Sequence, residues 1–250
     1  TATQVAEAIT DTTCLVSVMY ANNETGAIQP IREIGALCRK HGVLFHTDAV
    51  QAAGHLTIDV QRDNIDMLSL SAHKFHGPKG IGLLFAKSNI QLTSLIRGGG
   101  QERGKRAGTE NLPGIIGLAA ALKDAQENMQ ANTAYITGLR DALRNGLDKI
   151  DGASFNGSRE HCLPGTVNYS FQGVNGEALL SLLSNEGICC SSGSACSAGS
   201  LEPSHVLLAL GLSHETAQSA LRFSLCEYNT MDEVQTIITK VTEAVNRLRR

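Results

Sequence analysis

The alternation of apolar runs with a helix-spaced segment near the start of the chain constrains its fold more than any other feature. Residues 14–20 predict a buried strand, and the helical spacing that follows Pro30 predicts a helix ending at Gly42. Residues 43–47 predict a second strand, with Asp48 at its end. A strand, a helix and a strand in this order are typical of a parallel α/β sheet.

A third apolar run, residues 67–70, leads into a lysine, Lys74, that stands among small and hydrogen-bonding residues. The Gly-Pro-Lys-Gly that follows predicts a turn, and residues 82–86 predict a further strand. Lys74 is therefore expected at a strand end, where ligands bind in parallel α/β sheets. A lysine partly withdrawn from water can lose its proton and attack a carbonyl carbon. A Schiff-base lysine is one interpretation, and a surface lysine beside a turn is the other.

The second half of the chain predicts an α+β arrangement. A helical region begins at Pro113, and the polar stretch at residues 126–133 indicates a break between two helices and a domain boundary. We therefore expect one domain at residues 1–128 and a smaller one at residues 129–250. Strands are expected at residues 154–156, 167–171, 188–190 and 220–224, and helices at residues 177–184 and 203–210. Thr230 and Glu233 form a capping box that predicts the start of the last helix.

Composition and charge exclude several classes of function. The net charge of −3 and the lack of a long basic run give no electrostatic case for nucleic acid. No apolar stretch approaches the roughly 20 residues that span a bilayer, so a cytoplasmic protein is expected and no membrane partner. The seven cysteines are odd in number and form no C-x-x-C pair, which argues for a reducing compartment and against a zinc site. His73 and His76 lie three positions apart, a spacing that often occurs by chance, so no metal site is expected.

Cys196 differs from the other cysteines because small residues surround it at positions 191–200. Such residues cannot pack as a core, so we expect a mobile loop with an accessible thiol. An inert cysteine in a linker is the alternative. Cys189 and Cys190 are expected to be held in the preceding apolar strand, and Cys14, Cys38 and Cys226 to pack as small hydrophobic residues.

Five motifs together resemble the cysteine desulfurases of the NifS/IscS type, in the class V aminotransferase family. They are Ala-Asn-Asn-Glu-Thr-Gly, His-Thr-Asp-Ala-Val-Gln, Ser-Ala-His-Lys-Phe-His-Gly-Pro-Lys-Gly, Gly-Gly-Gly-Gln-Glu-Arg-Gly and Ser-Ser-Gly-Ser-Ala-Cys. They occur in the order of the family, and several stretches look closest to its nitrogen-fixation branch. The resemblance implies the α/β type I pyridoxal-phosphate-dependent transferase fold, with an incomplete large domain and a smaller α+β domain.

The resemblance also assigns a role to each matching residue. Lys74 would hold pyridoxal 5'-phosphate covalently, and Cys196 would accept sulfur from L-cysteine as a persulfide. The other residues would bind cofactor or substrate: Asp48 the pyridine nitrogen, Gln51 the ring hydroxyl, Ser71 and His73 the phosphate, Thr109 the phosphate of the neighbouring subunit, Asn23 cofactor and substrate, and Arg222 the substrate carboxylate. The role of Thr109 implies a homodimer with shared active sites.

The implied function is removal of sulfur from L-cysteine to give L-alanine, with transfer to an acceptor or iron-sulfur scaffold protein, including one that serves nitrogenase. Two alternatives stay open: a selenocysteine lyase or other type I pyridoxal-phosphate enzyme, and a non-catalytic fragment that binds partners. Family members carry a further segment before the point where this chain begins. We therefore expect that segment as a partner, and exposed apolar strand edges near Val16 and Leu44 without it.

Overall fold

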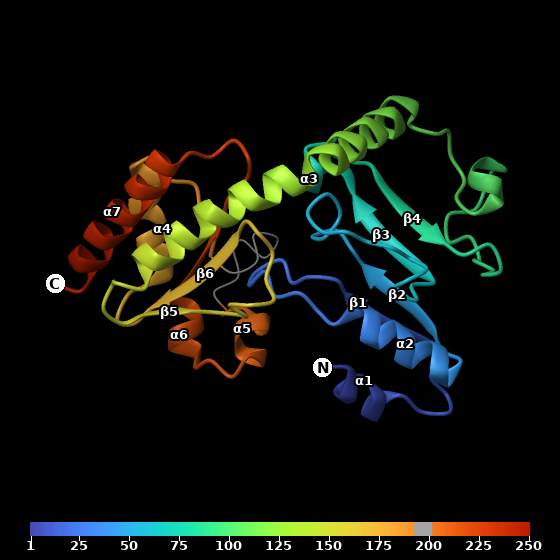
Figure 1. The fold of residues 1–250 in the computed structure, drawn as a ribbon, viewed down its shortest axis with the longest axis horizontal. Helices are drawn as coiled ribbons and strands as arrows, with labels where there is room; N and C mark the ends of the chain where they lie inside the picture. Colours follow the sequence, from blue (N-terminus) through green and yellow to red (C-terminus); the bar gives the residue numbers. More distant parts are fainter. Residues whose placement is uncertain (193–201) are drawn as a thin grey trace. The chain divides into compact units, whose positions relative to one another are not determined.

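The computed structural model describes residues 1–192 and 202–250, which form two compact units (Figure 1). Unit 1 comprises Thr1–Tyr20 and Gln29–Met129, and unit 2 comprises Ala21–Ile28 and Gln130–Arg250. Within the described residues each unit contains one β-sheet.

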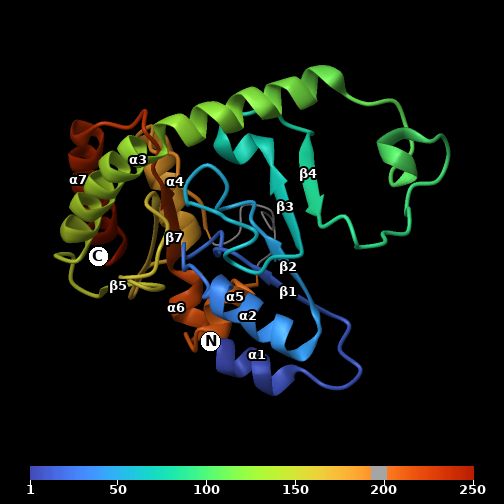
Figure 2. The ribbon, with the colours of Figure 1, turned by 45° about the vertical axis from the view of Figure 1, so that its right-hand side comes forward.

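The sheet of unit 1 has the strand order β1-β2-β3-β4, which Figure 2 shows. Its elements are α1 (Ala2–Ala8), β1 (Leu15–Met19), α2 (Ile31–His41), β2 (Leu44–Asp48), β3 (Met67–Ser71), the short 3-10 helices η1 (Ala72–Phe75) and η2 (Gln101–Gly104), and β4 (Gly82–Ala86). The first three strands are parallel, and β4 is antiparallel to β3. The predicted parallel strand-helix-strand unit is therefore confirmed.

The two sides of this sheet differ in what covers them. Helix α2 buries Ile31, Ile34 and Cys38 and contacts β2. It ends at Gly42, as predicted, and this glycine adopts a left-handed conformation with φ 69°. Every second residue of β1 is exposed, as are Leu44 and Asp48 at the ends of β2, and Leu15 and Leu44 are 43% and 39% accessible. Because side chains alternate between the faces of a strand, one accessible face of β1 and β2 carries Leu15, Met19 and Leu44 together with the polar residues Ser17, His46 and Asp48.

Unit 2 is built around an antiparallel sheet with the strand order β5-β6-β7. Its elements are β5 (Ala153–Phe155), β6 (Thr166–Phe171), α4 (Gly176–Asn185), α5 (His205–Ala209), α6 (His214–Gln218), β7 (Ala220–Ser224) and α7 (Met231–Leu248), together with the second part of α3 (Leu112–Leu147). Leu139, Leu143 and Leu147 lie four residues apart on α3 and are buried in the core. The capping box of Thr230 and Glu233 begins α7, as predicted.

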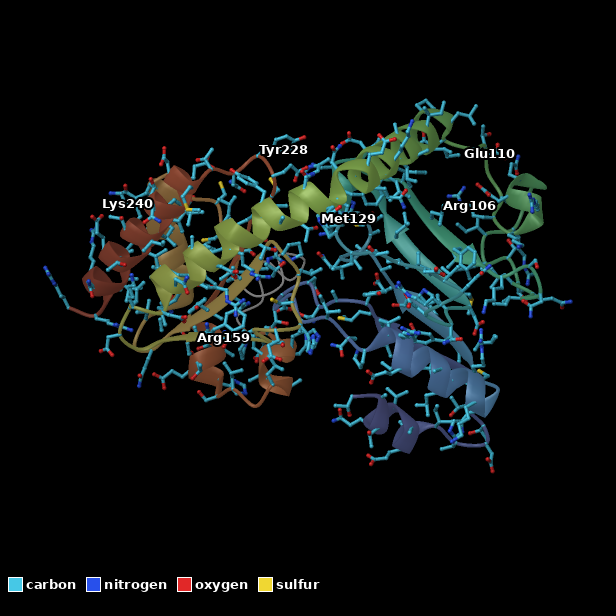
Figure 3. The ribbon with its side chains drawn as sticks, in the orientation of Figure 1. Arg106, Glu110, Met129, Arg159, Tyr228 and Lys240 are labelled. Atoms are coloured by element: carbon cyan, nitrogen blue, oxygen red, sulfur yellow. The ribbon has the colours of Figure 1, made fainter. Side chains whose placement is uncertain are left out.

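The structure corrects the predicted break between two helices at residues 126–133. Helix α3 runs for 36 residues through that stretch, and Figure 3 labels Met129 within it. The stretch contains neither glycine nor proline, and glutamine, glutamate and alanine are good helix formers. The polar residues therefore mark an exposed helix surface and not a helix end.

The predicted strand at residues 188–190 is also wrong. Only Ser191 pairs with β7, in an isolated bridge with Arg222, so the apolar character of the segment reflects burial of Ile188 in the core of unit 2. Cys189 is consequently exposed and not held in a strand, and Cys190 is partly buried. Cys14 is exposed as well, whereas Cys38 is buried as predicted.

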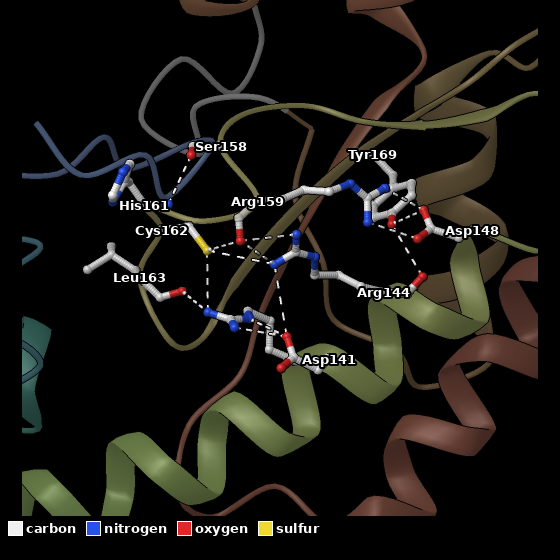
Figure 4. Close-up of polar contacts among 10 residues, drawn as sticks. Asp141, Arg144, Asp148, Ser158, Arg159, His161, Cys162, Leu163 and Tyr169 are labelled. Atoms are coloured by element: carbon white, nitrogen blue, oxygen red, sulfur yellow. Dashed lines mark hydrogen bonds and ion pairs between the residues drawn. The ribbon is translucent and has the colours of Figure 1, made fainter. Parts of the chain in front are cut away.

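A polar cluster links α3 to the strands of unit 2 (Figure 4). The Asp148 carboxylate accepts hydrogen bonds from Arg159 Nη1 and Nη2, at 2.9 and 2.8 Å, and from the Tyr169 hydroxyl at 2.6 Å. The hydrogen bonds from Arg159 are the main reason that the pKa of Asp148 is lowered. Arg144 lies over the Phe155 ring, with 4.5 Å between its Cζ and the ring centroid.

Among the helices of the described residues, none has the length and apolar character needed to cross a bilayer. In the same part of the chain, no three or more histidine, cysteine or acidic side chains gather as a metal ion would require.

Candidate active site

The carboxyl ends of β2 and β3 bring several predicted residues to one edge of the sheet in unit 1. Asp48 ends β2 and Ser71 ends β3, and the two strands are parallel neighbours with Asp48 in register with Ser69. Lys74 follows directly in η1 and is partly buried. The predicted position of Lys74 close to a strand end is therefore confirmed.

The turn that carries Lys74 is fixed on both sides. Ala72 and Phe75, at the two ends of η1, are buried, and His55 Nε2 donates a hydrogen bond of 3.2 Å to the carbonyl oxygen of Lys74. The residue before His55 is Gly54, where a Cβ would lie only 2.8 Å from Cβ of Phe75. A side chain at position 54 would therefore push against the turn that holds the lysine.

Hydrogen bonds orient the polar side chains at the same edge. Ser71 Oγ and His73 Nδ1 share a hydrogen bond of 2.8 Å, and Asp48 Oδ1 accepts one of 2.9 Å from the backbone N–H of Val50. Gln51, which follows in the turn after β2, is partly buried. Asp48, Gln51, Ser71, His73 and Lys74 thus all follow or end two adjacent strands.

A hydrogen-bonded bridge crosses the three parallel strands beside Asp48, and it was not predicted. His46 of β2 lies 2.8 Å from Ser17 Oγ of β1 through Nδ1, and 2.8 Å from Ser69 Oγ of β3 through Nε2. The bridge ties the strands whose ends carry the candidate residues. The alternation of His46 with buried Phe45 and Thr47 was the available signal, but it does not reveal the two serine partners.

Thr109 is exposed and lies between η2 and α3. Its neighbour Glu110 is labelled in Figure 3.

Cys196 falls outside the described residues, which end at Ser192 and resume at Glu202. Among the described cysteines, Cys190 has its pKa raised to about 11, first by burial and then by the charge of Cys189. Cys190 is therefore a protonated, weakly nucleophilic thiol at neutral pH.

In unit 2, the structure brings Asn23 and Arg222 together. Asn23 lies in the turn Ala21–Ile28, where Asn22 Oδ1 accepts from the backbone N–H groups of Glu24 and Thr25, at 2.9 Å each. Arg222 is a central residue of β7, and its Nη1 donates a hydrogen bond of 2.7 Å to the carbonyl oxygen of Asn23. The guanidinium is thereby held against the turn.

Two further residues of this region were missed by sequence reasoning. Glu24 is buried in the turn, and Asn168 of β6 donates from Nδ2 to the carbonyl oxygen of Glu24 at 3.1 Å. Glu24 belongs to the motif Ala-Asn-Asn-Glu-Thr-Gly, and Asn168 lies in the predicted strand at residues 167–171. A carboxylate in a polar turn nevertheless gives no sign in the sequence that it will be buried.

Comparison with known proteins defines the class. The family model described as Aminotransferase class-V matches residues 1–237, so the chain belongs to the class V aminotransferase family. A cysteine desulfurase IscS of Clostridium botulinum is 50% identical over 248 residues, which are 98% of this chain and 62% of that protein.

Solved structures place the fold in the same group. A structure described as a NifS-like protein has a TM-score of 0.90 and 38% identity, and the match covers 99% of this chain and 65% of that one. A second, described as SspA in complex with cysteine, has a TM-score of 0.73 and 40% identity over 92% of this chain and 64% of that one. The chain thus spans less than two thirds of the length of these relatives. The structural similarity confirms the predicted type I pyridoxal-phosphate fold.

Proposed function

We propose that the protein containing this chain is a pyridoxal-phosphate-dependent cysteine desulfurase. It removes sulfur from L-cysteine, gives L-alanine, and carries the sulfur as a persulfide on Cys196 for iron-sulfur cluster assembly. One observation supports this most directly: partly buried Lys74 follows β3 directly, while Asp48 ends the adjacent parallel strand β2. The 50% identity to a protein named cysteine desulfurase supports it independently.

The donor set at this edge fits pyridoxal phosphate. A carboxylate suits a protonated ring nitrogen, an amine suits an aldehyde, and the hydrogen-bonded Ser71 and His73 suit a phosphate group. When bound, the cofactor supplies an electron sink for the electrons released at the substrate α-carbon. Asp48 would pair with the protonated ring nitrogen, and Gln51 would bond the ring hydroxyl. Lys74 would hold the aldehyde carbon covalently, and its amine, once free, would move the proton of the substrate α-carbon.

Unit 2 supplies the residues for the substrate. The Arg222 guanidinium pairs with the carboxylate of L-cysteine, and its bond to the Asn23 carbonyl oxygen limits the orientations it can adopt. The Cys196 thiolate attacks the substrate sulfur, so that a sulfur-sulfur bond forms as the carbon-sulfur bond breaks. The electrons of the broken bond remain with the carbon fragment, which becomes alanine after protonation.

The Ser-Ser-Gly-Ser-Ala-Cys motif favours a desulfurase over an aminotransferase, because transamination needs no thiol. The same resemblance supports a cytoplasmic homodimer, in which Thr109 reaches the phosphate of the neighbouring subunit, and a sulfur-acceptor protein as partner. Selenocysteine is the alternative substrate, since it has the same carboxylate and α-carbon as cysteine and differs only in carrying selenium in place of sulfur.

The test is to purify the protein that contains this chain, load it with pyridoxal phosphate and supply L-cysteine with a reductant. We expect a yellow protein that releases sulfide and alanine in equal amounts. Selenocysteine in a parallel reaction decides the substrate preference. A colourless protein would support the non-catalytic alternative, and a yellow protein without sulfide release would contradict the desulfurase.

A further inference from the structure

Glu24 has a buried side chain, 1% accessible, next to the proposed substrate-binding residues of unit 2. Its Oε2 accepts a hydrogen bond of 2.5 Å from the hydroxyl of Ser204. The hydroxyl donates and the carboxylate oxygen accepts, so this oxygen has a hydrogen-bond partner although the side chain is buried. Because a buried carboxylate without hydrogen bonds is strongly unfavourable, the contact with Ser204 is specific and not a chance surface contact.

The Ser204 hydroxyl has a second task. It is the N-cap of α5 and accepts from the backbone N–H groups of Val206 and Leu207, at 3.1 and 3.4 Å. One oxygen therefore receives two hydrogen bonds from the helix while its proton is directed to Glu24. The hydroxyl of Ser204 in this way joins the start of α5 to Glu24 of the turn Ala21–Ile28.

Described residues on both sides of the segment that carries Cys196 are linked to the turn Ala21–Ile28, one directly and one through Arg222. After the segment, Ser204 bonds Glu24 of the turn. Before it, Ser191 exchanges two backbone hydrogen bonds with Arg222, of 3.1 and 2.7 Å, and Arg222 bonds the carbonyl oxygen of Asn23. The turn thus bonds Arg222, which is proposed to bind the substrate carboxylate. It is also linked to Ser191 and Ser204, which are described residues before and after the segment that carries Cys196.

We propose that Glu24 is a positioning residue for sulfur transfer, acting through Ser204 on the chain that carries Cys196. The inference rests on the proposed function. Loss of the Glu24 to Ser204 contact leaves Lys74 and Arg222 in place, so cofactor and substrate still bind. Ser204, which follows the segment that carries Cys196, is then no longer bonded to the turn, so sulfur transfer slows. The expected signature is a lower kcat with an unchanged KM for L-cysteine.

The two tasks of Ser204 can be separated with a matched pair of variants. Asparagine and aspartate have the same shape and both cap helices well. The amide of Ser204→Asn can donate to Glu24, whereas the carboxylate of Ser204→Asp repels it. We expect a kcat near wild type for Ser204→Asn, and for Ser204→Asp a loss of about tenfold or more, since the hydrogen bond to Glu24 is replaced by an unfavourable contact between two carboxylates.

Charge exchange provides the rescue. In the double variant Glu24→Gln with Ser204→Asp, the glutamine amide donates to the new carboxylate, so kcat should return toward wild type. Should Ser204→Asp fail to fold, Ser204→Gly replaces it, because glycine retains most of the capping preference and has no donor for Glu24. Equal loss in Ser204→Asn and Ser204→Asp, or no rescue in the double variant, would show that the helix cap alone matters and would overturn the proposal.

A second measurement does not need the desulfurase reaction. The alkylation rate of Cys196 by a neutral maleimide, followed by mass spectrometry without substrate, reports how the chain around the thiol is held. We expect Ser204→Asp to change this rate, and Ser204→Asn and the double variant to match wild type. Identical rates in all variants would refute the positioning role. Absence of sulfide release from wild type would instead refute the proposed function, while the alkylation rates still decide the role of Glu24.

Discussion

Arg222 and Asn23 are joined by a hydrogen bond of 2.7 Å between Nη1 and the backbone carbonyl oxygen, although 199 positions separate them in the sequence. The bond fixes one N–H group of the guanidinium. The orientation of this planar group is therefore set both by strand β7, which carries Arg222, and by the turn that contains Asn23. An arginine held in this way is suited to a carboxylate, which it can bind through two parallel hydrogen bonds.

The first prediction is that Arg222→Lys raises the KM for L-cysteine. Lysine keeps the positive charge but has neither the two-pronged donor geometry nor the reach to the Asn23 carbonyl oxygen. We expect an increase of about tenfold or more, because charged hydrogen bonds contribute about 1.5 to 3 kcal/mol each. Steady-state kinetics and the absorbance spectrum of the bound cofactor check it. Arg247→Lys, on the exposed surface of α7, is the control and should change neither.

The second prediction is that Lys74→Ala abolishes covalent attachment of the cofactor. Lys74 is partly buried directly after β3, whereas Lys79 is exposed and Lys87 forms an ion pair of 2.7 Å with Asp66. Borohydride reduction followed by peptide mapping identifies the labelled lysine. Lys79→Ala is the control and should retain the label on Lys74. Recovery of the label on Lys79 or Lys87 of the wild-type protein would contradict the assignment.

The third prediction is that Asp48→Asn retains the cofactor but loses most turnover. Asparagine can still accept from the Val50 N–H group, so the local turn is preserved, but it carries no negative charge for the ring nitrogen. We expect kcat to fall by about 100-fold, in line with the roughly 3 kcal/mol that a single electrostatic contact contributes in other enzymes. Turnover equal to wild type, in a protein with a full complement of cofactor, would rule out this role.

Much of the fold could be predicted because its signals are local. Pro30 and Gly42 mark the ends of α2, and the capping box at Thr230 marks the start of α7. The errors arose where a local signal had two meanings. Polar residues at 126–133 lie on the surface of the continuous helix α3, and Ile188 packs in the core of unit 2 although residues 188–190 form no strand. The order of the sequence also cannot show that the turn Ala21–Ile28 belongs to unit 2.

The candidate site was predictable in part for the same reason. Asp48, Ser71, His73 and Lys74 follow strand ends that can be located from apolar runs. The partners of Lys74 and Arg222 could not be predicted, because His55 and Asn23 lie 19 and 199 positions away from them in the sequence. Glu24 and Ser204 are 180 positions apart, and only the fold shows that the carboxylate is buried against the hydroxyl.

The fourth prediction concerns acid stability. The pKa of Asp148 is lowered in the folded state, mainly by its hydrogen bonds from Arg159, so the folded protein favours the ionised carboxylate. The resulting stabilisation is complete above the pKa of an unfolded aspartate, about 3.9, and is lost as pH falls through the lower folded-state value. Because the pair is partly exposed, we expect the contribution at pH 7 to be about 1 kcal/mol.

Urea unfolding of wild type and Asp148→Asn between pH 7 and pH 2.5 measures this contribution. The variant should be less stable at pH 7, and the difference should shrink below about pH 4 as the wild-type carboxylate takes up its proton. Asp232→Asn, on the exposed first turn of α7, is the control for general charge effects. A constant difference between wild type and Asp148→Asn over the whole pH range would contradict the linkage.

The last prediction is that Cys196 alone carries the transferable sulfur. Among the described cysteines, Cys38 and Cys162 are buried, and the pKa of Cys190 near 11 keeps its thiol protonated at neutral pH. Cys196→Ser should still bind L-cysteine, because binding rests on Lys74 and Arg222, but it should release no sulfide since a hydroxyl cannot hold sulfur as a persulfide. Binding shows as a change in the absorbance of the bound cofactor, and turnover shows as sulfide released in reductant.

The exposed Cys189 provides the matched control, because it lies in the same stretch of sequence and is accessible to reagents. Cys189→Ser should keep wild-type turnover, and mass spectrometry of the wild-type protein without reductant should find one added sulfur atom on the peptide that contains Cys196. An added sulfur on Cys189 or Cys226, or sulfide release by Cys196→Ser, would mean that another thiol attacks the substrate. The accessibility of that other thiol to the substrate would then matter more than the small residues around Cys196, and the role assigned to Cys196 would be wrong.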